Sequence, residues 1–363
     1  MLIVNVVKKI YNNVNDNIKR KSDILSTIKM VAKEAGVSTM TVSRVLNQSQ
    51  PVREETKKRV MAAVKKLDYQ PNQAARIMRG GKANILGVLI PDFTNPFYAE
   101  FLKYIEEAAA KYGFRLLITS NNATNNQIDN VQYLINRNVD AIIVCSYNKI
   151  KNAAQYLSNN YPDIPMVVLD KLERGINMNS VYADGFIGIK NVVEYLIKEG
   201  HKKIAMIKGN TNHLIANDRY LGYEETLKSH GIEVRNDYIY EGDYTMQTGV
   251  AAVEYFLSLK DKPTVIVSSS DYIAIGAIHQ LIQRGYRVPE DFSVTGYDGI
   301  YMGEISHPQL TTIKIPISDM AQKTVQILMD DMNTADIKKN EKITVRYIGD
   351  LCIKGSTGKF KDK

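Results

Sequence analysis

From Asn84 to the end of the chain, short apolar runs alternate with segments of helical periodicity, and this alternation limits the folds that the chain can adopt. The predicted strands are Ile85–Ile90, Arg115–Thr119, Ala141–Cys145, Met166–Leu169, Lys203–Ile207, Thr264–Ser268, Ser293–Thr295 and Thr344–Ile348. The predicted helices are Phe97–Tyr112, Ile128–Asn136, Gly185–Glu199, Asp218–His230, Gln247–Leu259, Tyr272–Arg284 and Ser318–Met332. Strands and helices in alternation predict parallel sheets that are covered by helices on both faces.

The length of this α/β part favours two lobes over one. The chain has 363 residues, so roughly 280 of them follow Asn84, which is more than one doubly wound sheet usually contains. Such lobes bind ligands at the carboxyl ends of their strands. We therefore expect two doubly wound lobes with a ligand-binding cleft between them.

Upstream of this part, the stretch from Thr27 to Asn47 contains two short amphipathic helical patterns around a glycine. Their apolar positions are Ile28, Val31, Ala32 and Ala35, then Val42, Val45 and Leu46. Gly36 interrupts the first pattern, and Ser38 supplies a side-chain oxygen that can cap the second helix. This is the layout of a DNA-binding helix-turn-helix, although an ordinary helical hairpin in a core shares it.

The positive charge of the chain is concentrated at the end that holds this motif. Residues 1–82 carry 17 Lys and Arg against 6 Asp and Glu, whereas the remainder carries 30 against 33. A basic module on a mildly acidic body indicates a polyanionic partner. A third amphipathic helix, predicted from Arg53 to Leu67, carries outward lysines that either face solvent only or add to this basic surface.

The composition is that of an ordinary water-soluble protein, with 44% hydrophobic and 24% charged residues. No run is long and apolar enough to cross a membrane, and residues 1–26 do not resemble a signal peptide. The two cysteines, Cys145 and Cys352, indicate a reducing compartment. We expect a cytoplasmic protein with no membrane contact, in which residues 1–26 are a flexible N-terminal extension or a basic arm that lies on DNA.

Several segments resemble the lac-repressor/galactose-repressor (LacI/GalR) family of bacterial transcriptional regulators. They are TIKMVAKEAGVSTMTVSRVLN, YQPNQAARIMRGG, ILGVLIPDFTNPFYAE, EGHKKIAMIKG, DRYLGYEETL, SVTGYDG, HPQLTTI and LCIKGSTG. The resemblance implies an α/β core of two doubly wound lobes, like that of periplasmic binding proteins, and an all-α helix-turn-helix head piece. It places the head piece at residues 27–72, a hinge helix and linker at 73–82, and the effector-binding and dimerisation domain at 83–363.

The same resemblance implies the partners of the chain. Members of the family are homodimers whose two head pieces bind a pseudo-palindromic operator in double-stranded DNA, and whose cores close on a small effector, often a sugar. A two-fold dimer would present two recognition helices one turn of DNA apart. We therefore expect a transcriptional repressor with a sugar or sugar phosphate as its effector. Whether the effector releases or strengthens DNA binding stays open.

The second helix of the motif carries the candidate base contacts. Thr39, Met40 and Arg44 occupy the positions that contact bases in the family. Arg44 can donate two hydrogen bonds to a guanine edge, and Thr39 and Met40 can contact a thymine methyl group. The candidate phosphate contacts are Ser38, Thr41, Ser43, Asn47 and the hydroxyl group of Tyr69. For the hydroxyl groups, helix capping is an alternative that is compatible with a phosphate contact.

Residues 73–79 match the hinge helix of the family, which forms on DNA because so short a helix is marginal in isolation. Met78 stands where relatives place a leucine that enters the minor groove as an apolar wedge. Ala75, one turn earlier, would let two hinge helices approach closely. The alternative is a plain linker in which this methionine has no role.

The candidate effector contacts follow the predicted core strands. They are Asp92, Asn95, Phe97, Tyr98, Asp170, Lys171, Arg219, Ser270, Asp271 and Asp298. An aromatic pair beside polar groups suits a sugar ring or a flat base. Arg219 matches the effector arginine of the family, and together with Asp298 it offers the donors and the acceptor that a polyol needs. The alternatives are core positions for Phe97 and Tyr98 and surface ion pairs for the charged residues.

Other classes of protein fit the sequence less well. The chain contains no P-loop, no G-x-G-x-x-G, no clustered histidines and no metal-ligand spacing, so we expect neither an enzyme nor a bound metal or cofactor. A solute-binding protein would share the core, but it would need a signal peptide and would lack residues 27–82. A global catabolite-type regulator controlled by a protein coeffector stays open as an alternative.

The hypothesis of an apolar wedge makes a testable prediction. We expect Met78→Asp to abolish operator binding, because a carboxylate group is too costly to place between stacked base pairs, while the core stays folded. Operator affinity and the circular dichroism of the variant measure these two outcomes. Undiminished operator affinity would rule out the wedge.

Overall fold

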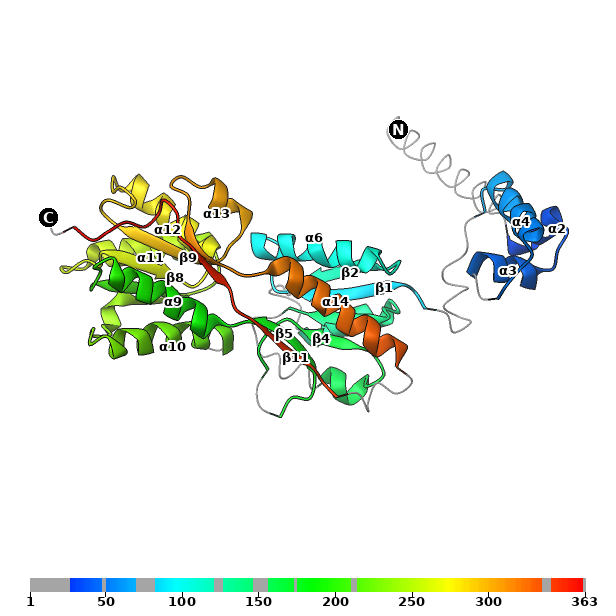
Figure 1. Ribbon diagram of the computed structural model, residues 1–363, viewed down its shortest axis with the longest axis horizontal. Helices are drawn as coiled ribbons and strands as arrows, with labels where there is room; N and C mark the ends of the chain where they lie inside the picture. The colour runs from blue at the N-terminus through cyan, green and yellow to red at the C-terminus, as the bar shows by residue number, and fades with distance from the viewer. Residues whose placement is uncertain are drawn as a thin grey trace, which may run out of the picture. The chain divides into compact units, whose positions relative to one another are not determined.

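The computed structural model describes residues 27–47, 50–69, 82–120, 127–145, 156–172, 175–209, 214–334 and 341–361. They form two compact units, which divide between Lys82 and Ala83 (Figure 1). The first unit consists of helices, and the second contains two six-stranded sheets with helices on both faces. None of the described helices is long and apolar enough to cross a membrane.

The first unit packs three helices around one small core. They are α2 (Ile28–Ala35), α3 (Thr39–Asn47) and α4 (Glu54–Lys66). The buried core residues are Val31, Ala32, Ala35, Val42, Val45, Val60 and Ala63. Gly36 ends α2 at a φ of 63°, in the left-handed conformation that glycine adopts at little cost. Ser38 precedes α3, and its Oγ accepts the amide hydrogen of Thr41 at 3.1 Å. The predicted helix-turn-helix is confirmed.

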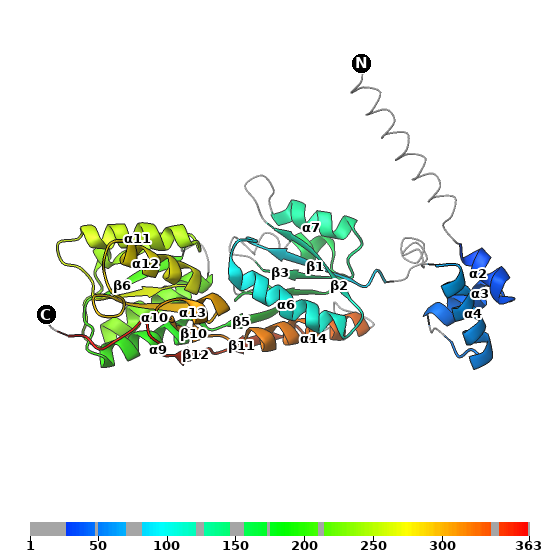
Figure 2. The same cartoon turned by 90° about the horizontal axis from the view of Figure 1, so that it is seen from above.

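The first lobe of the second unit is built on a parallel sheet with the strand order β11-β5-β4-β3-β1-β2. Its strands are β1 (Ile85–Ile90), β2 (Arg115–Ser120), β3 (Ala141–Val144), β4 (Met166–Val168), β5 (Asn179–Ala183) and β11 (Thr344–Tyr347). Helices α6 (Pro96–Ala110) and α14 (Ile317–Asn333) cover one face, and α7 (Gln127–Asn136) covers the other (Figure 2). Successive residues of β1 therefore enter different cores, Val88 on the side of α6 and Leu89 on the side of α7.

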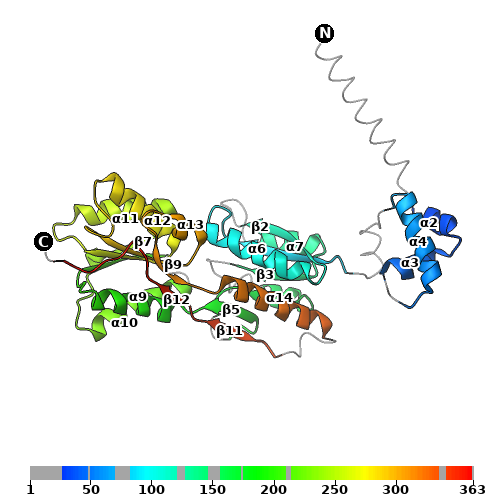
Figure 3. The same cartoon turned by 45° about the horizontal axis from the view of Figure 1, so that its top comes forward.

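The second lobe has the strand order β12-β10-β9-β8-β6-β7, in which β12 runs antiparallel to β10 and the other pairs are parallel. Its strands are β6 (Ile204–Gly209), β7 (Ile239–Gly242), β8 (Val265–Ser268), β9 (Ser293–Asp298), β10 (Thr311–Lys314) and β12 (Asp350–Cys352). Helices α9 (Gly185–Lys198) and α10 (Leu214–Ser229) cover one face, and α11 (Met246–Ser258) and α12 (Asp271–Gln283) cover the other (Figure 3). The short helices η1 (Asn236–Tyr238) and α13 (Tyr301–Ile305) precede β7 and β10.

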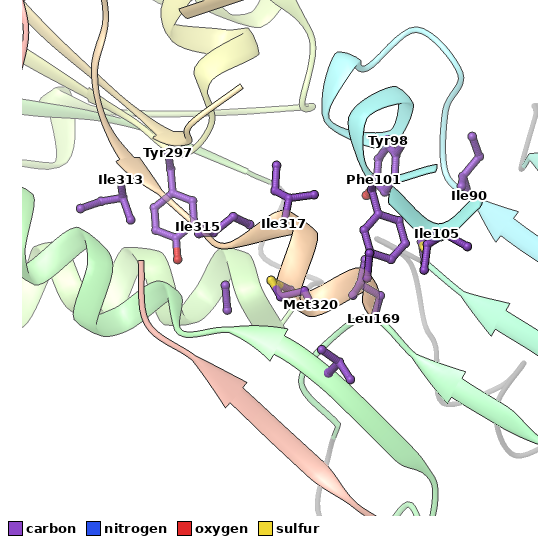
Figure 4. Close-up of a cluster of buried hydrophobic side chains, with 14 of the residues drawn as sticks. Ile90, Tyr98, Phe101, Ile105, Leu169, Tyr297, Ile313, Ile315, Ile317 and Met320 are labelled. Carbon is purple, nitrogen blue, oxygen red and sulfur yellow. The ribbon is translucent and has the colours of Figure 1, made fainter. Parts of the chain in front are cut away.

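Within the described residues, three segments of the chain cross between the lobes. They are the junctions β5–α9, β10–α14 and β11–β12 (Figure 1). One apolar core cluster runs from lobe to lobe along the second junction, from Tyr297 and Ile313 through Ile315 and Ile317 to Phe101 (Figure 4). The two doubly wound lobes that the sequence predicts are confirmed, and they share a core.

The sequence-based prediction omits four strands that the structure contains, β5, β7, β10 and β12. Strand β5 begins with Asn179 and Ser180, and β10 begins with Thr311 and Thr312, so neither shows the apolar run that marks a buried strand. Asn179 is buried because its side-chain amide donates to the carboxylate of Asp331 at 2.8 Å. Such partners lie far apart in the sequence, so a local pattern does not reveal them.

Helices α9 and α10 approach each other closely at Gly222. A Cβ atom at this position would lie 2.4 Å from the carbonyl oxygen of Phe186, which belongs to the backbone of α9. We expect Gly222→Ala to destabilise the core by about 1–3 kcal/mol, because the two helices must separate. Chemical denaturation measures this loss, and Glu225→Ala, a change of an exposed residue in the same helix, is the control. Equal stability of the Gly222→Ala variant and the parent would contradict this packing argument.

Candidate functional site

Helix α3 presents three side chains to solvent and buries its opposite face. Val42 and Val45 lie in the core, whereas Thr39, Met40 and Arg44 are exposed, Met40 to 62%. Nη2 of Arg44 donates to Sδ of Met40, one helical turn away, at 3.4 Å. The packing of the first unit does not need these side chains, and together they offer a cationic donor beside an apolar surface.

Hydroxyl groups at the start of α3 cap the helix. Oγ of Ser38 lies 2.9 Å from Oγ1 of Thr41 and accepts the amide hydrogen of the same residue. Ser38 is exposed, so capping and a phosphate contact are compatible there. Ser43 and Tyr69 are half-buried, and Tyr69 packs against the small core of the first unit.

The other candidate DNA contacts lie at the limits of the described residues or beyond them. Asn47 is the last residue of α3. Ala75 and Met78, and with them the predicted hinge helix, lie outside the described residues. The same is true of residues 1–26. These interpretations therefore stay predictions from the sequence.

A cavity lies between the two lobes of the second unit. It encloses about 650 Å³ of empty space, part of which is open to solvent. Its lining residues are Phe97, Tyr98, Leu169, Asp170, Tyr182, Ala183, Ile215, Arg219, Tyr244, Asp298, Ile315 and Met320. Ala183 ends β5 and Asp298 ends β9, so the carboxyl ends of strands from both sheets contribute to the wall. The candidate effector contacts that the structure brings to this wall are Phe97, Tyr98, Asp170, Arg219 and Asp298.

Arg219 is held firmly in the wall of the cavity. The residue is 7% exposed, its Nη1 donates to the carbonyl oxygen of Ser269, and its Nη2 lies 3.4 Å from Oδ1 of Asp298. The guanidinium carbon lies 3.8 Å from the centre of the Tyr297 ring, a cation–π contact that orients the group further. A Cβ atom at Gly185 would lie 2.7 Å from Cγ of Arg219, so a glycine there makes room for the side chain.

Two buried carboxyl groups lie near this guanidinium group. Burial raises the pKa of Asp170 and that of Asp298 to about 8, although the positive charge of Arg219 opposes the rise. Each carboxyl group therefore loses its proton at a higher pH than a solvent-exposed carboxyl group does, and in its protonated form it can donate as well as accept a hydrogen bond. The cavity can accordingly match hydroxyl groups, which also do both.

Aromatic rings supply much of the apolar wall. Phe97 and Tyr98 meet edge to face with their ring centres 5.1 Å apart. Tyr98 is also a member of the apolar core, so in this residue the core role and the cavity role are combined. Tyr182 and Tyr244 line the cavity as well, and sequence reasoning missed both. Tyr182 lies in β5 and Tyr244 follows β7, two strands that show no clear pattern in the sequence.

Two candidate contacts shape the loop between β1 and α6 and are not among the lining residues. Oδ1 of Asp92 accepts the amide hydrogen of Thr94 at 2.8 Å, which closes a local turn. The side chain of Asn95 caps α6 by accepting the amide hydrogen of Phe97 at 3.0 Å. These bonds position the helix that carries the two aromatic rings.

Lys171 forms an ion pair between the lobes. Its Nζ lies 2.6 Å from Oδ2 of Asp218, which belongs to α10 in the second lobe. Another bond between the lobes runs from the amide of Tyr301 to Oε1 of Glu100, at 2.7 Å. These bonds hold the lobes together in addition to the crossing segments, and Lys171 itself is not among the lining residues.

Ser270 and Asp271 are buried inside the second lobe and are not among the lining residues. Oγ of Ser270 caps α12 by accepting the amide hydrogen of Ile273 at 3.3 Å. The two carboxylate oxygens of Asp271 accept a hydrogen bond from Oγ1 of Thr312 at 2.5 Å and one from the amide of Ile300 at 2.8 Å. The described bonds of both residues are therefore internal, and those of Asp271 fix the turn that follows β9.

Comparison with known families finds a match for each unit of the chain. Residues 27–72 match the model of bacterial regulatory proteins of the lacI family. Residues 83–350 match the model of periplasmic binding proteins and the sugar binding domain of the LacI family. Together the two matches span the head piece and nearly all of the two-lobed core.

Individual relatives match over most of their length. The HTH-type transcriptional repressor PurR of Mannheimia succiniciproducens is 30% identical over 338 residues, which are 93% of this chain and 100% of the relative. Catabolite control protein A of Priestia megaterium is 35% identical over 311 residues, 85% of this chain and 92% of the relative. The structure of the lac repressor dimer bound to operator and the anti-inducer ONPF aligns with a TM-score of 0.81 at 25% identity, over 92% of this chain and 99% of that chain.

The buried carboxyl group of Asp170 predicts a pH dependence. Burial raises its pKa from 3.8 to about 8, so the folded state holds this proton more tightly than the unfolded state does. Its contribution to stability is therefore greatest below about pH 4 and is lost as the pH rises through about 8. We expect Asp170→Asn, which stays neutral, to gain melting temperature over the parent increasingly from about pH 5 to about pH 9. Thermal denaturation across that range measures the difference, and a difference that does not change with pH would count against a raised pKa.

Proposed function

This chain is a member of the LacI family of bacterial regulatory proteins, and we propose that it is a transcriptional repressor that binds a pseudo-palindromic operator as a homodimer. The observation that carries the proposal is the exposed face of α3, where Met40 and Arg44 lie one turn apart on a helix whose other face is buried. In the major groove, the arginine can bind a guanine edge and the methionine a thymine methyl group.

The other DNA contacts of the proposal are those that the resemblance to the family implies. Thr39 would contact a base beside Met40. Phosphate groups would be contacted by Ser38, Thr41, Ser43, Asn47 and Tyr69. Met78 would enter the minor groove as an apolar wedge of a hinge helix, and Ala75 would let two such helices approach each other closely. The excess of Lys and Arg in residues 1–82 supports this arrangement, and the solved complex of the lac repressor dimer with operator supports a dimer as the binding species.

We propose that the effector is a neutral sugar and that it binds in the cavity between the lobes. Phe97 and Tyr98 would stack against the ring, while Asp170, Arg219 and Asp298 would bind its hydroxyl groups. Among the described lining residues Arg219 is the only cation, and it already contacts Asp298. A neutral sugar can be bound in either protonation state of Asp170 and Asp298, whereas a sugar phosphate is repelled whenever they are ionised. We propose the neutral ligand because its binding does not depend on these protons.

A second candidate function is that of a global catabolite-type regulator controlled by a protein coeffector. The observation that favours it is the 35% identity to catabolite control protein A. A small-molecule cavity does not decide between the two candidates, because a core that closes on a metabolite can also bind a protein. The number of genomic binding sites distinguishes them.

The experiment that tests the proposal is the retention of fragmented genomic DNA from the source organism by the purified protein, followed by sequencing. We expect a few palindromic sites beside genes for the transport or breakdown of a sugar. Many dispersed sites would favour the global regulator instead. Arg44→Ala should lose the selective retention, and Arg59→Ala, an exposed arginine change in α4 of the same unit, should keep it. No selective retention by the parent protein, with and without added metabolites, would overturn the proposal.

Replacement of the buried arginine tests the effector site. We expect Arg219→Ala to weaken the response of operator binding to the effector about tenfold or more, because hydrogen bonds to a charged group are lost. Operator affinity without effector should stay the same. Titration of a sugar panel against the protein–operator complex measures both quantities. A loss of operator affinity in the absence of sugar would instead mean that Arg219 is needed for the fold.

A further inference from the structure

The second unit begins with a short segment that is bound by a single carboxylate group. Oδ1 of Asp140 accepts the amide hydrogen of Ala83 at 3.0 Å, and Oδ2 accepts the amide hydrogen of Ile85 at 2.9 Å. The amide of Asp140 in turn donates to the carbonyl oxygen of Ile85 at 2.8 Å. Asp140 thus makes three hydrogen bonds to the first residues of the core, from the loop that precedes β3.

The residue between the two bound amides holds the chain in a bend. Asn84 has a φ of 58°, a left-handed conformation that asparagine tolerates better than most other residues. Its carbonyl oxygen accepts the amide hydrogen of Arg115, the first residue of β2, at 2.9 Å. Ala83 is only 2% exposed, although it directly follows Lys82, where the first unit ends. The bend is therefore tied to strands β1, β2 and β3 at once.

A carboxylate is the side-chain group that suits this position. Its two oxygens can accept one hydrogen bond each from two amides that lie two residues apart, and the negative charge strengthens both bonds. An asparagine has one oxygen and can replace only one of the bonds. With one amide released to water, the segment from Ala83 to Ile85 would turn more freely about the bend.

We infer that Asp140 is a positioning residue that fixes the direction in which the chain leaves the core toward the DNA-binding unit. This inference rests on the proposed function. Strands β1 and β3 run from this bend to the edge of the sheet that faces the cavity, so a rotation of the first lobe on ligand binding turns the bound segment by the same angle. Unrestricted backbone rotation at Ala83 would let the first lobe rotate without turning the linker that leads to the DNA-binding unit.

The inference has a direct structural test. In the full chain, Asp140→Asn should make at least one of the two amide hydrogens, that of Ala83 or that of Ile85, exchange with solvent about tenfold faster, because a charge-assisted bond is lost. Asp330→Asn is the matched control, since it makes the same chemical change at an exposed position of the same lobe. Exchange at the two amides that is equal in Asp140→Asn, the control and the parent would overturn the inference.

A functional test measures the consequence for DNA binding. The probe is a duplex that the parent protein retains from genomic fragments, and a scrambled duplex of the same length reports non-specific binding. In a dimer, backbone rotation at the bend lowers the effective concentration of the second head piece after the first has bound. Asp140→Asn should therefore bind the retained duplex about tenfold more weakly than the parent does. The affinity of Asp140→Asn for the scrambled duplex should equal that of the parent. The control, Asp330→Asn, should keep the melting temperature of the parent.

A second variant keeps the test independent of any fault in folding. Asn84→Gly leaves the carboxylate in place but loosens the bend, so it should weaken specific binding in the same direction. Parent-like specific affinity in both Asp140→Asn and Asn84→Gly would overturn the inference and leave the proposed function intact. Absence of a retained duplex for the parent protein would overturn the proposed function, and the role of the bend in DNA binding with it.

Discussion

Burial of one continuous apolar core across the boundary between the lobes is the constraint on which the cavity depends. Tyr297 belongs to that core, its ring makes a cation–π contact with Arg219, and its hydroxyl group donates to the carbonyl oxygen of Asp184 at 3.0 Å. Asp184 lies in the first crossing segment, where its carboxylate pairs with Arg346 at 2.6 Å and its amide donates to the carbonyl oxygen of Tyr347. The residues that join the lobes therefore also orient the guanidinium group in the cavity.

Because the same residues join the lobes and orient Arg219, the angle between the lobes is coupled to the shape of the cavity wall. A ligand that fits one angle better than another shifts the population of lobe arrangements by its difference in affinity, and by no more than that. The contacts Lys171–Asp218 and Glu100–Tyr301 also join the lobes. Both involve side chains that are partly open to water, so their contribution is modest and a small molecule can outweigh it.

The first unit could be predicted almost completely from the sequence, because its signals are local. Gly36 marks the turn, Ser38 marks the cap, and the apolar spacing of a helix is short-range. The α/β alternation likewise predicted the lobes and, after the ends of strands, Phe97, Tyr98, Asp170 and Asp298 on the cavity wall. Arg219 was predicted from the resemblance to the family. The hinge residues and residues 1–26 lie outside the described part of the chain, so their interpretation still rests on the sequence.

Asp271 shows why the rest of the site could not be predicted. It follows a strand, as Asp170 and a ligand-binding carboxylate in such a fold do, so its position after a strand does not mark it as an internal residue. Its partners, Thr312 and Ile300, are 41 and 29 residues away, and they occupy its carboxylate inside the lobe. Tyr244 is the opposite case, since no pattern marks it and the path of the chain brings it to the wall. Contacts between residues this far apart in the sequence form only when the whole core folds, so a local pattern does not reveal them.

The third crossing segment supplies an edge strand to each sheet from one short piece of chain. Strand β11 completes the first sheet, and β12 completes the second. The first lobe also takes α14 from beyond the second lobe, so neither lobe is encoded by an uninterrupted stretch of sequence. A single cut in the gene cannot separate the lobes or exchange one of them for that of a relative. Exchange of one lobe would need all three crossing segments to match those of the relative, so substitutions within the wall are the simpler route to a new ligand specificity.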